Sequence, residues 1–223
     1  MSKEAWDDVR RHVGQTKAEP LVLGDLNSYI VRSTPRHLLF TLSRYKFIAR
    51  LLCNDGPMKV LELGCGEGLS TVIIAEDGHE ITAVDFDERS ISYANEHIKK
   101  VGLEFKCDDF IGKLYGSFDA VVSLDVIEHI NEDREDELMA TICSNLQPHG
   151  LTVIGTPNIT ASPYASENSK IGHINLYSAQ RLTALVRKYF WNAFVFGMND
   201  EVVHTGFYPM CHYLFVVGCG KKI

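Results

Sequence analysis

Between residues 37 and 155, short apolar segments alternate with segments whose apolar residues recur at helical spacing. Apolar runs of a few residues bounded by glycine and polar clusters are typical of buried strands. Consecutive strands that are separated by helices pair in parallel, because a parallel connection needs a crossover rather than a tight turn. The alternation therefore predicts an α/β fold with a doubly wound, mostly parallel sheet. The predicted strands are 60–63, 80–84, 105–107, 118–124 and 151–155, and the predicted helices are 37–52, 68–77, 87–100 and 131–146.

The chain after the fifth predicted strand has a different pattern. A polar loop at 157–176 is followed by a helix at 178–189 and by two apolar segments at 193–198 and 212–218. Because no helix separates these two segments, they are expected to form an antiparallel pair at the edge of the sheet. The sheet is thus predicted to have seven strands, with an antiparallel edge strand.

Length and composition favour one globular domain over residues 1–223. No repeat or linker divides the sequence, so residues 1–35 are interpreted as an N-terminal lid and residues 157–176 as a substrate-side loop. The net charge of −7 argues against a nucleic-acid partner, which usually needs a basic face. The sequence shows neither a membrane span nor the apolar stretch of a secretion signal, which predicts a cytoplasmic protein. The six cysteines lack metal-ligand spacing and are expected to be reduced thiols.

A glycine-rich turn, ELGCGEG at residues 62–68, follows the first predicted strand. Gly64 and Gly66 permit a tight turn and let the backbone of Gly64, Cys65 and Gly66 approach a ligand closely. Glu62 lies at the end of the strand. A carboxylate there would repel a pyrophosphate but can meet an ammonium group, which favours a ligand with an amino-acid moiety.

Acidic residues follow the second and third predicted strands. Asp85 ends the second strand, 21 residues after Gly64, where a carboxylate can accept both hydroxyls of a ribose. Phe86 can flank an adenine ring. Either Asp108 or Asp109, after the third strand, can accept from the adenine amino group, and Asp108 is preferred. The alternative role for each of these acids is to cap the following helix.

The segments VLELGCGEG, AVDFD, CDDF and FDAVVSLDVIEHI together resemble the class I S-adenosylmethionine methyltransferases, in particular the branch of the ubiquinone-biosynthesis O-methyltransferases. The resemblance covers residues 37–190 and implies a Rossmann-like fold. It implies that S-adenosylmethionine is bound by Glu62, Gly64, Gly66, Asp85, Phe86, Asp108 and the backbone near Leu124.

An arginine before the first strand reaches the cofactor carboxylate in the resembled branch. Arg44 is in register with it, and Arg50 is the competing candidate. A charge on a solvated helix face is the alternative for both residues.

Asp125, Glu128 and His129 follow the fourth predicted strand at i, i+3 and i+4, which would place all three on one side of a helical turn. Three interpretations remain open. The group orients the loop, or His129 is a general base whose tautomer a carboxylate fixes, or the three residues bind Mg²⁺ or another divalent cation. The resemblance favours the cation, because a comparable acid-x-x-Glu-His set binds metal in some ubiquinone methyltransferases and in small-RNA 2′-O-methyltransferases. The sequence departs from that set by having Asp at 125.

His173, in the loop after the fifth strand, is a further catalytic candidate beside His129 and Glu128, because many resembled enzymes have a histidine there. The loop is short and its large apolar residues are few, whereas the ubiquinone enzymes have a longer apolar insertion. We therefore expect a small, polar acceptor, such as a sugar or a precursor of a surface glycan or specialised metabolite, methylated on oxygen or nitrogen. The alternatives are a metal-assisted RNA 2′-O-methyltransferase, a ubiquinone-type O-methyltransferase and a non-catalytic subunit.

Overall fold

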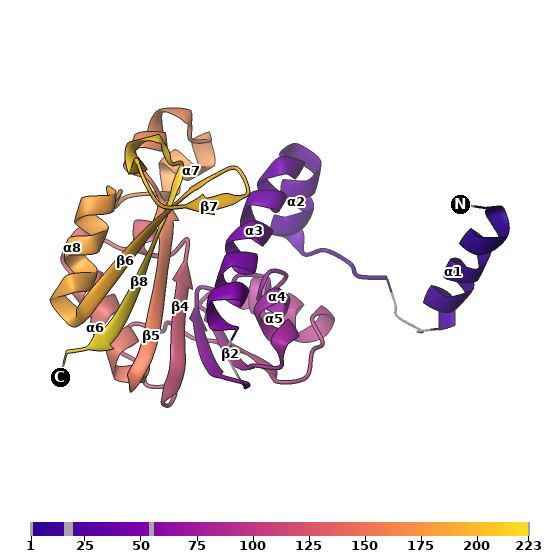
Figure 1. Ribbon diagram of the computed structural model, residues 1–223, viewed down its shortest axis with the longest axis horizontal. Coiled ribbons are helices and arrows are strands. Elements are labelled where there is room, and N and C mark those ends of the chain that lie inside the picture. The colour runs from indigo at the N-terminus through magenta and orange to yellow at the C-terminus, as the bar shows by residue number, and fades with distance from the viewer. Residues whose placement is uncertain (1, 16–19, 54–55, 223) are drawn as a thin grey trace.

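The computed structural model describes residues 2–15, 20–53 and 56–222, and eight strands of these residues form one sheet (Figure 1). Their order is β3-β2-β1-β4-β5-β8-β6-β7. The first five strands are parallel to one another, whereas β8 is antiparallel to both β5 and β6, and β7 is antiparallel to β6. The bounds are β1 (Lys59–Leu63), β2 (Glu80–Asp85), β3 (Leu103–Cys107), β4 (Phe118–Leu124), β5 (Leu146–Pro157), β6 (Phe190–Asn199), β7 (Val202–His204) and β8 (Tyr213–Lys221).

The predicted fold class is confirmed, but the predicted count of seven strands is wrong. The antiparallel pair expected at 193–198 and 212–218 is present as β6 and β8. The additional strand is the short β7, which pairs with the end of β6. A tight turn joins these two strands, and Asp200 in it has a left-handed φ of 49°. Three residues after a turn are too few to produce a strand signal in the sequence.

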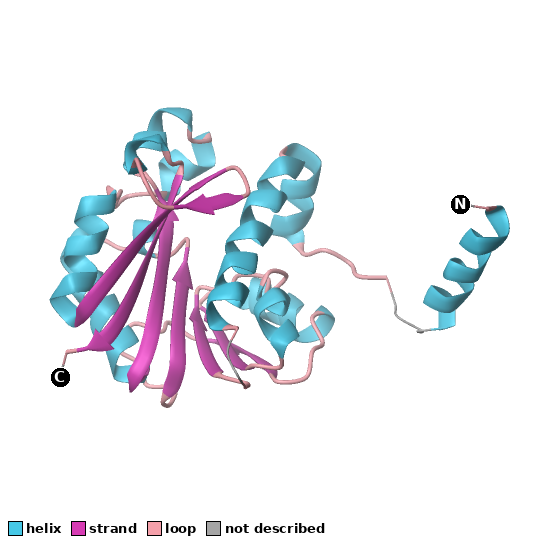
Figure 2. Cartoon of the chain, in the orientation of Figure 1, coloured by secondary structure: helices cyan, strands magenta, loops and turns pink. Residues whose placement is uncertain are grey.

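Helices cover both faces of the sheet (Figure 2). Alternate strand residues enter two separate cores, as the period of two requires. Leu61 of β1 packs in the core formed with α6 and α8, and its neighbour Val60 packs in the core formed with α3, α4 and α5. The bounds are α1 (Lys3–Gln15), α2 (Asp25–Ser33), α3 (Pro35–Leu52), α4 (Thr71–Ile74), α5 (Glu88–His97), α6 (Glu135–Asn145), α7 (Glu167–Gly172) and α8 (Ala179–Tyr189).

Several elements are shorter than expected from the sequence. The helix predicted at 68–77 is reduced to α4 and one 3-10 turn, η1 (Ala75–Asp77). All four residues of α4 are β-branched, which lowers their helix propensity, and Gly68 has a left-handed φ of 71°, so no helix begins there. Four further 3-10 turns occur in the described chain, namely η2 (Ile127–His129), η3 (Glu132–Arg134), η4 (Ile159–Tyr164) and η5 (Tyr208–Met210).

The segment expected to be a lid, residues 1–35, contains two helices. α1 has no buried residue and lies apart from the sheet in Figure 1. α2 packs on α3, and its first backbone N–H groups, those of Leu26 and Asn27, donate to the Glu67 carboxylate at 2.7 and 3.0 Å. Residues 16–19 of the expected lid lie outside the described residues. No helix in the described part of the chain is long and apolar enough to cross a membrane.

The order of the strands reverses direction between β1 and β4. In open α/β sheets, ligands bind at such a switch point, outside the carboxyl ends of the strands. The glycine-rich turn follows β1, Asp85 ends β2, and Asp125 follows β4. The fold therefore brings the motifs found in the sequence to one edge of the sheet.

Candidate cofactor and catalytic site

The glycine-rich turn has a backbone that favours glycine. Gly64 and Gly66 have φ of 85° and 52°, in the left-handed region. A Cβ on Gly64 would overlap with the side chain of Val126, in the loop after β4, whereas a Cβ on Gly66 would have no atom within 4 Å. Gly64 therefore allows two loops to approach each other, and Gly66 faces open space that a ligand can enter.

Asp85 is buried at the end of β2 and braces this turn. Its Oδ2 accepts from the backbone N–H of Gly66 at 2.8 Å, and its Oδ1 accepts from that of Asp87 at 2.9 Å. Each carboxylate oxygen can accept a further bond, as two ribose hydroxyls would require. The Phe86 ring is 75% exposed beside Asp85, so an apolar ring is available to pack against an adenine.

The two candidates after β3 differ in their contacts. Asp108 accepts a hydrogen bond from the Tyr115 hydroxyl at 3.0 Å and lies 3.8 Å from the Lys113 ammonium. Asp109 Oδ1 accepts from the backbone N–H of Ile111 at 3.3 Å, within the local turn. Asp109 thus accepts from the backbone of its own turn, as a capping residue does. Asp108 is therefore the better candidate to accept from the adenine amino group.

Glu62 is fully enclosed and lacks a partner for one of its oxygens. Its Oε1 accepts from the Tyr45 hydroxyl at 2.6 Å, and its buried Oε2 has no hydrogen-bond partner among the described residues. Burial raises the pKa of Glu62 to about 7. An unpartnered carboxylate oxygen beside the glycine-rich turn fits the ammonium group of an amino-acid moiety.

Arg44 reaches the same edge of the sheet from α3. It is buried, pairs with Asp125 Oδ2 at 2.5 Å and lies 3.9 Å above the Tyr213 ring. Its buried Nε has no acceptor among the described residues, which fits an additional anion such as the cofactor carboxylate. Arg50, the competing candidate, is exposed in the last turn of α3.

Asp125 does not lie on one helical turn with Glu128 and His129, as the spacing predicted. It precedes η2 and has a left-handed φ of 55°, and its side chain pairs with Arg44. The backbone N–H of Asp125 is held by the carbonyl of Gly155 at 3.0 Å. The prediction from the i, i+3, i+4 spacing is wrong for Asp125 because the chain turns sharply at the end of β4, before any helical turn begins.

Glu128, His129 and His173 form the cluster instead, with candidate ligand atoms that all lie within 4.8 Å of one another. Glu128 is fully buried, its Oε2 accepts from the Thr156 hydroxyl at 2.9 Å, and its Oε1 has no partner among the described residues. Burial, followed by the charge of Asp125, raises the pKa of Glu128 to about 8. A buried carboxylate with an unpartnered oxygen needs either a proton or a cation.

The two imidazoles of the cluster are oriented for ligation or proton transfer. His129 Nδ1 donates to the carbonyl of Gly172 at 2.8 Å, which leaves Nε2 as the free nitrogen. The His173 ring lies edge-on to the His129 ring, with 5.0 Å between centroids. Burial and the neighbouring His129 lower the pKa of His173. A neutral imidazole is the form that binds a metal or accepts a proton.

The donor set of one carboxylate and two imidazoles fits a divalent cation. The two imidazoles suit Fe²⁺ or Zn²⁺ and the carboxylate suits Mn²⁺, whereas Mg²⁺ prefers an all-oxygen set. Three site residues, Thr156, Tyr45 and Tyr213, had no role predicted from the sequence. Each contacts a charged site residue from a different element, so only the packing of the elements reveals it.

A family model described as methyltransferase domain matches residues 36–192 of the chain. The chain belongs to this family. Among its curated relatives is the ubiquinone biosynthesis O-methyltransferase of Caulobacter sp. (strain K31), which is 32% identical over 120 residues, 52% of this chain and 46% of the relative. The enzyme of the same name from Chromobacterium violaceum is 31% identical over 127 residues, 54% of this chain and 53% of the relative. The chain thus spans about half the length of these relatives.

Solved structures share the fold at low sequence identity. The plantazolicin methyltransferase BpumL in complex with S-adenosylhomocysteine has a TM-score of 0.64 at 15% identity, covering 87% of this chain and 88% of that chain. The N-methyltransferase NodS from Bradyrhizobium japonicum WM9 has 0.62 at 17% identity, covering 86% and 91%. The methyltransferase domain of bacterial CtHen1-C has 0.60 at 20% identity, covering 81% and 98%.

The family match confirms the interpretation of this sequence as a methyltransferase domain, and the solved structures share the fold that the resemblance to S-adenosylmethionine methyltransferases implies. The resemblance to the ubiquinone-biosynthesis branch is confirmed as well. The names of the relatives and neighbours cover both O- and N-methyl transfer, so the acceptor has to be argued from the site itself.

Proposed function

We propose that this chain methylates a hydroxyl oxygen of a small polar molecule, and that Glu128, His129 and His173 manage the proton of that hydroxyl. The observation that carries the proposal is the cluster of these three side chains at the cofactor edge of the sheet. The methyl group of a sulfonium is already activated, so the protein mainly aligns the nucleophile with the methyl carbon and the sulfur. A hydroxyl must in addition lose its proton, which requires a base or a cation.

The residues of the cluster would hold a divalent cation through Glu128 Oε1 and one nitrogen of each imidazole. When such a cation is bound, it would lower the pKa of the acceptor hydroxyl. His129 Nε2 is the alternative proton acceptor, since the carbonyl of Gly172 holds its Nδ1 as the protonated nitrogen. Thr156 supports either role by binding the other oxygen of Glu128.

An oxygen acceptor fits this cluster better than a nitrogen acceptor. A neutral amine has a free lone pair and needs no cation to become a nucleophile. A hydroxyl is a weak nucleophile until it is deprotonated, and three proton- or cation-binding groups at the site address that step. Of the two acceptor atoms that the sequence leaves open, oxygen is therefore the one that this cluster serves.

A ubiquinone-type phenol is the second candidate acceptor. The curated relatives favour it, and so do two exposed apolar residues on the substrate-side segment, Ile171 and Ile174, which are 78% and 58% exposed. Incubation with methyl-labelled cofactor separates the candidates. In a panel of sugars, catechols and amines, labelling of a sugar supports the small polar acceptor and labelling of a catechol supports the ubiquinone-type phenol, whereas labelling of amines alone would contradict an oxygen acceptor. Repeating each reaction with a chelator shows whether a cation is required.

Asp85→Ala is expected to weaken S-adenosylmethionine binding by about 2–3 kcal/mol, or about 30- to 150-fold, because two charge-assisted hydrogen bonds to the ribose are lost. Titration calorimetry measures the affinity. Asp87→Ala is the matched control, since Asp87 caps α5 through the N–H of Arg89 and should affect stability alone. Unchanged affinity in a folded Asp85→Ala variant would remove Asp85 from the cofactor site.

Cofactor affinity is expected to fall as the pH decreases through about 7. Burial raises the pKa of Glu62 to about 7, so this carboxyl is protonated below that pH and cannot bind an ammonium group. Below the pKa, the binding of S-adenosylmethionine should release up to about one proton, and its affinity should drop by up to about tenfold per pH unit. Calorimetry in buffers of different ionisation enthalpy counts the proton. Glu62→Gln should abolish its release, and a pH-independent affinity in the wild type would refute the ammonium contact.

A further inference from the structure

His173 lies on a segment without regular secondary structure. α7 ends at Gly172, and residues 173–176 connect it to the short bridge that Tyr177 makes with Asn158. Asn175 and Tyr177 are nevertheless almost fully buried. An irregular segment keeps a side chain in a defined position only when other elements bind its backbone and its neighbours.

Contacts with η2 hold one side of this segment. The backbone N–H groups of Ile174 and Asn175 donate to the carbonyl of Glu128 at 2.9 and 3.0 Å. The carbonyl of Gly172 accepts from His129 Nδ1 at 2.8 Å. The residues on both sides of His173 are therefore bound to the two other members of the cluster.

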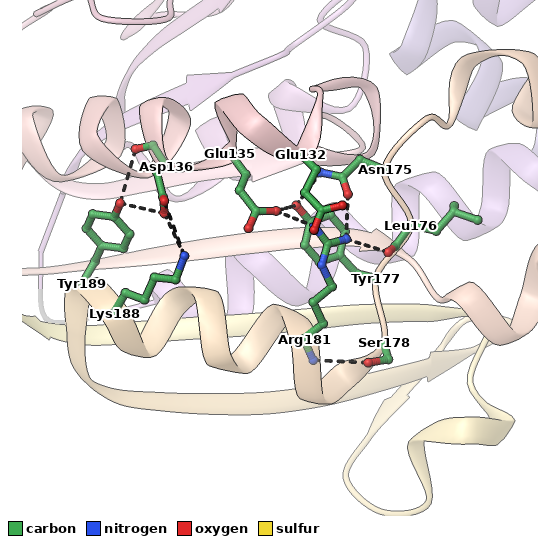
Figure 3. A network of polar contacts seen from close by, with 10 residues as sticks. All are labelled: Glu132, Glu135, Asp136, Asn175, Leu176, Tyr177, Ser178, Arg181, Lys188 and Tyr189. Carbon is green, nitrogen blue, oxygen red and sulfur yellow. Dashed lines mark hydrogen bonds and ion pairs between the residues drawn. The ribbon is translucent and has the colours of Figure 1, made fainter.

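Arg181 of α8 holds the other side (Figure 3). Its Nη1 donates to Asn175 Oδ1 at 2.6 Å and to the carbonyl of Leu176 at 2.8 Å. Its Nη2 pairs with Glu135 Oε2 of α6 at 2.6 Å, and its guanidinium lies 4.1 Å from the centre of the Tyr177 ring. The planar guanidinium of Arg181 thus contacts a side-chain amide, a backbone carbonyl, an aromatic ring and a carboxylate at the same time.

Two hydrogen bonds between its partners close this network. The Tyr177 hydroxyl donates to Glu135 Oε2 at 2.6 Å and accepts from Asn175 Nδ2 at 2.8 Å. The Asn175 side chain is thereby fixed at both its oxygen and its nitrogen, two residues from His173. Removing the Arg181 guanidinium would leave Asn175 Oδ1 without this donor. It would also remove the only hydrogen bond shown to the Leu176 carbonyl within the described residues.

We infer that Arg181 is a positioning residue for the reaction, which holds the His173 segment from the side of α8 so that the His173 imidazole stays beside His129 and Glu128. The inference rests on the proposed function, because it gives the Glu128–His129–His173 cluster a role. None of the contacts shown for Arg181 reaches Glu128, His129 or His173, so it acts through Asn175, Leu176 and Tyr177.

A second bridge between the same two helices provides a matched control (Figure 3). Lys188 of α8 lies 3.1 Å from Asp136 Oδ1 of α6, and the Tyr189 hydroxyl donates to the same oxygen at 2.9 Å. These contacts join α8 to α6 as Arg181 does, but none of the contacts shown for Lys188 reaches residues 173–177. A loss of helix–helix bridging alone should therefore appear in Lys188→Met as well as in Arg181→Met.

The first measurement reports the geometry without a metal. In the wild-type chain of residues 1–223, the rings of His129 and His173 are close enough to give a through-space NMR contact. Arg181→Met should lose this contact, Lys188→Met should keep it, and Arg181→Lys should weaken it because a single ammonium cannot replace the fork. Arg181→Met with the contact intact would overturn the inference.

The second measurement reports the site, with Mn²⁺ alone as the probe. Arg181→Met should weaken Mn²⁺ binding by about 10- to 100-fold, as loss of an outer-shell partner does, while S-adenosylmethionine affinity stays within about twofold. His173→Asn should weaken Mn²⁺ binding at least as much, and Lys188→Met should leave it unchanged. Wild-type affinity in Arg181→Met would overturn the positioning role. Absence of Mn²⁺ binding in the wild type, together with a lost ring contact in Arg181→Met, would refute the proposed cation site and leave the positioning role standing.

Discussion

His129→Ala is expected to lower turnover by about 10²–10⁴-fold while S-adenosylmethionine affinity stays within about twofold, because the residue acts on the acceptor proton and not on the cofactor. The structure leaves His129 Nε2 free and fixes Nδ1 on the carbonyl of Gly172. Methyl transfer from labelled cofactor to the acceptor gives the turnover, and calorimetry gives the affinity. His149→Ala, at an exposed position near the start of β5, is the control and should behave as the wild type.

A chelator separates the two ways in which His129 can act. If the cluster binds a cation, a chelator should abolish activity and Mn²⁺ should restore it, with Mg²⁺ less effective on two imidazoles and one carboxylate. If His129 is a base, the chelator should have no effect, and the pH–rate profile of the variant should lose the limb of an imidazole. His129→Asn that retains more than about a third of wild-type turnover would contradict both, because an acid–base group is worth at least about tenfold.

The cofactor edge of the site could be predicted from the sequence because it depends on local rules. A glycine-rich turn after a buried strand and an acid at the end of the next strand meet wherever the strands pair in parallel. Gly66 and Asp85 are joined by a hydrogen bond of 2.8 Å, although 19 residues separate them. The alternation of strands and helices dictates this contact.

The catalytic side was less predictable because it depends on loops. Asp125 was expected beside Glu128, yet the left-handed backbone at Asp125 directs it to Arg44. His173 joins the cluster from a segment that Arg181 contacts at the Leu176 carbonyl and the Tyr177 ring, and no local pattern in the sequence encodes these contacts. The missed strand β7 has the same cause, since a turn at Asp200 and not a periodic pattern produces it.

The two glycines of the turn are expected to respond differently to the same substitution. Gly64→Ala should lower the free energy of unfolding by about 2–5 kcal/mol, of which about 1–2 come from the left-handed φ and about 1–3 from overpacking against Val126. Val126 is buried and β-branched, so its side chain cannot rotate away freely. Gly66→Ala should lose only the part due to φ, about 1–2 kcal/mol, because its Cβ meets no atom within 4 Å.

The order should reverse in cofactor binding. The Cβ of Gly66→Ala projects into the open space beside the turn, where it should weaken S-adenosylmethionine binding by about tenfold or more, equivalent to about 1.4 kcal/mol. Folded Gly64→Ala, measured at low temperature, should bind S-adenosylmethionine with an affinity closer to that of the wild type, because its Cβ points at the loop after β4. Chemical unfolding and calorimetry on the two variants measure both quantities. Equal losses of stability would contradict the contact of Gly64 with Val126, and wild-type affinity in Gly66→Ala would show that the cofactor does not approach the turn at Gly66.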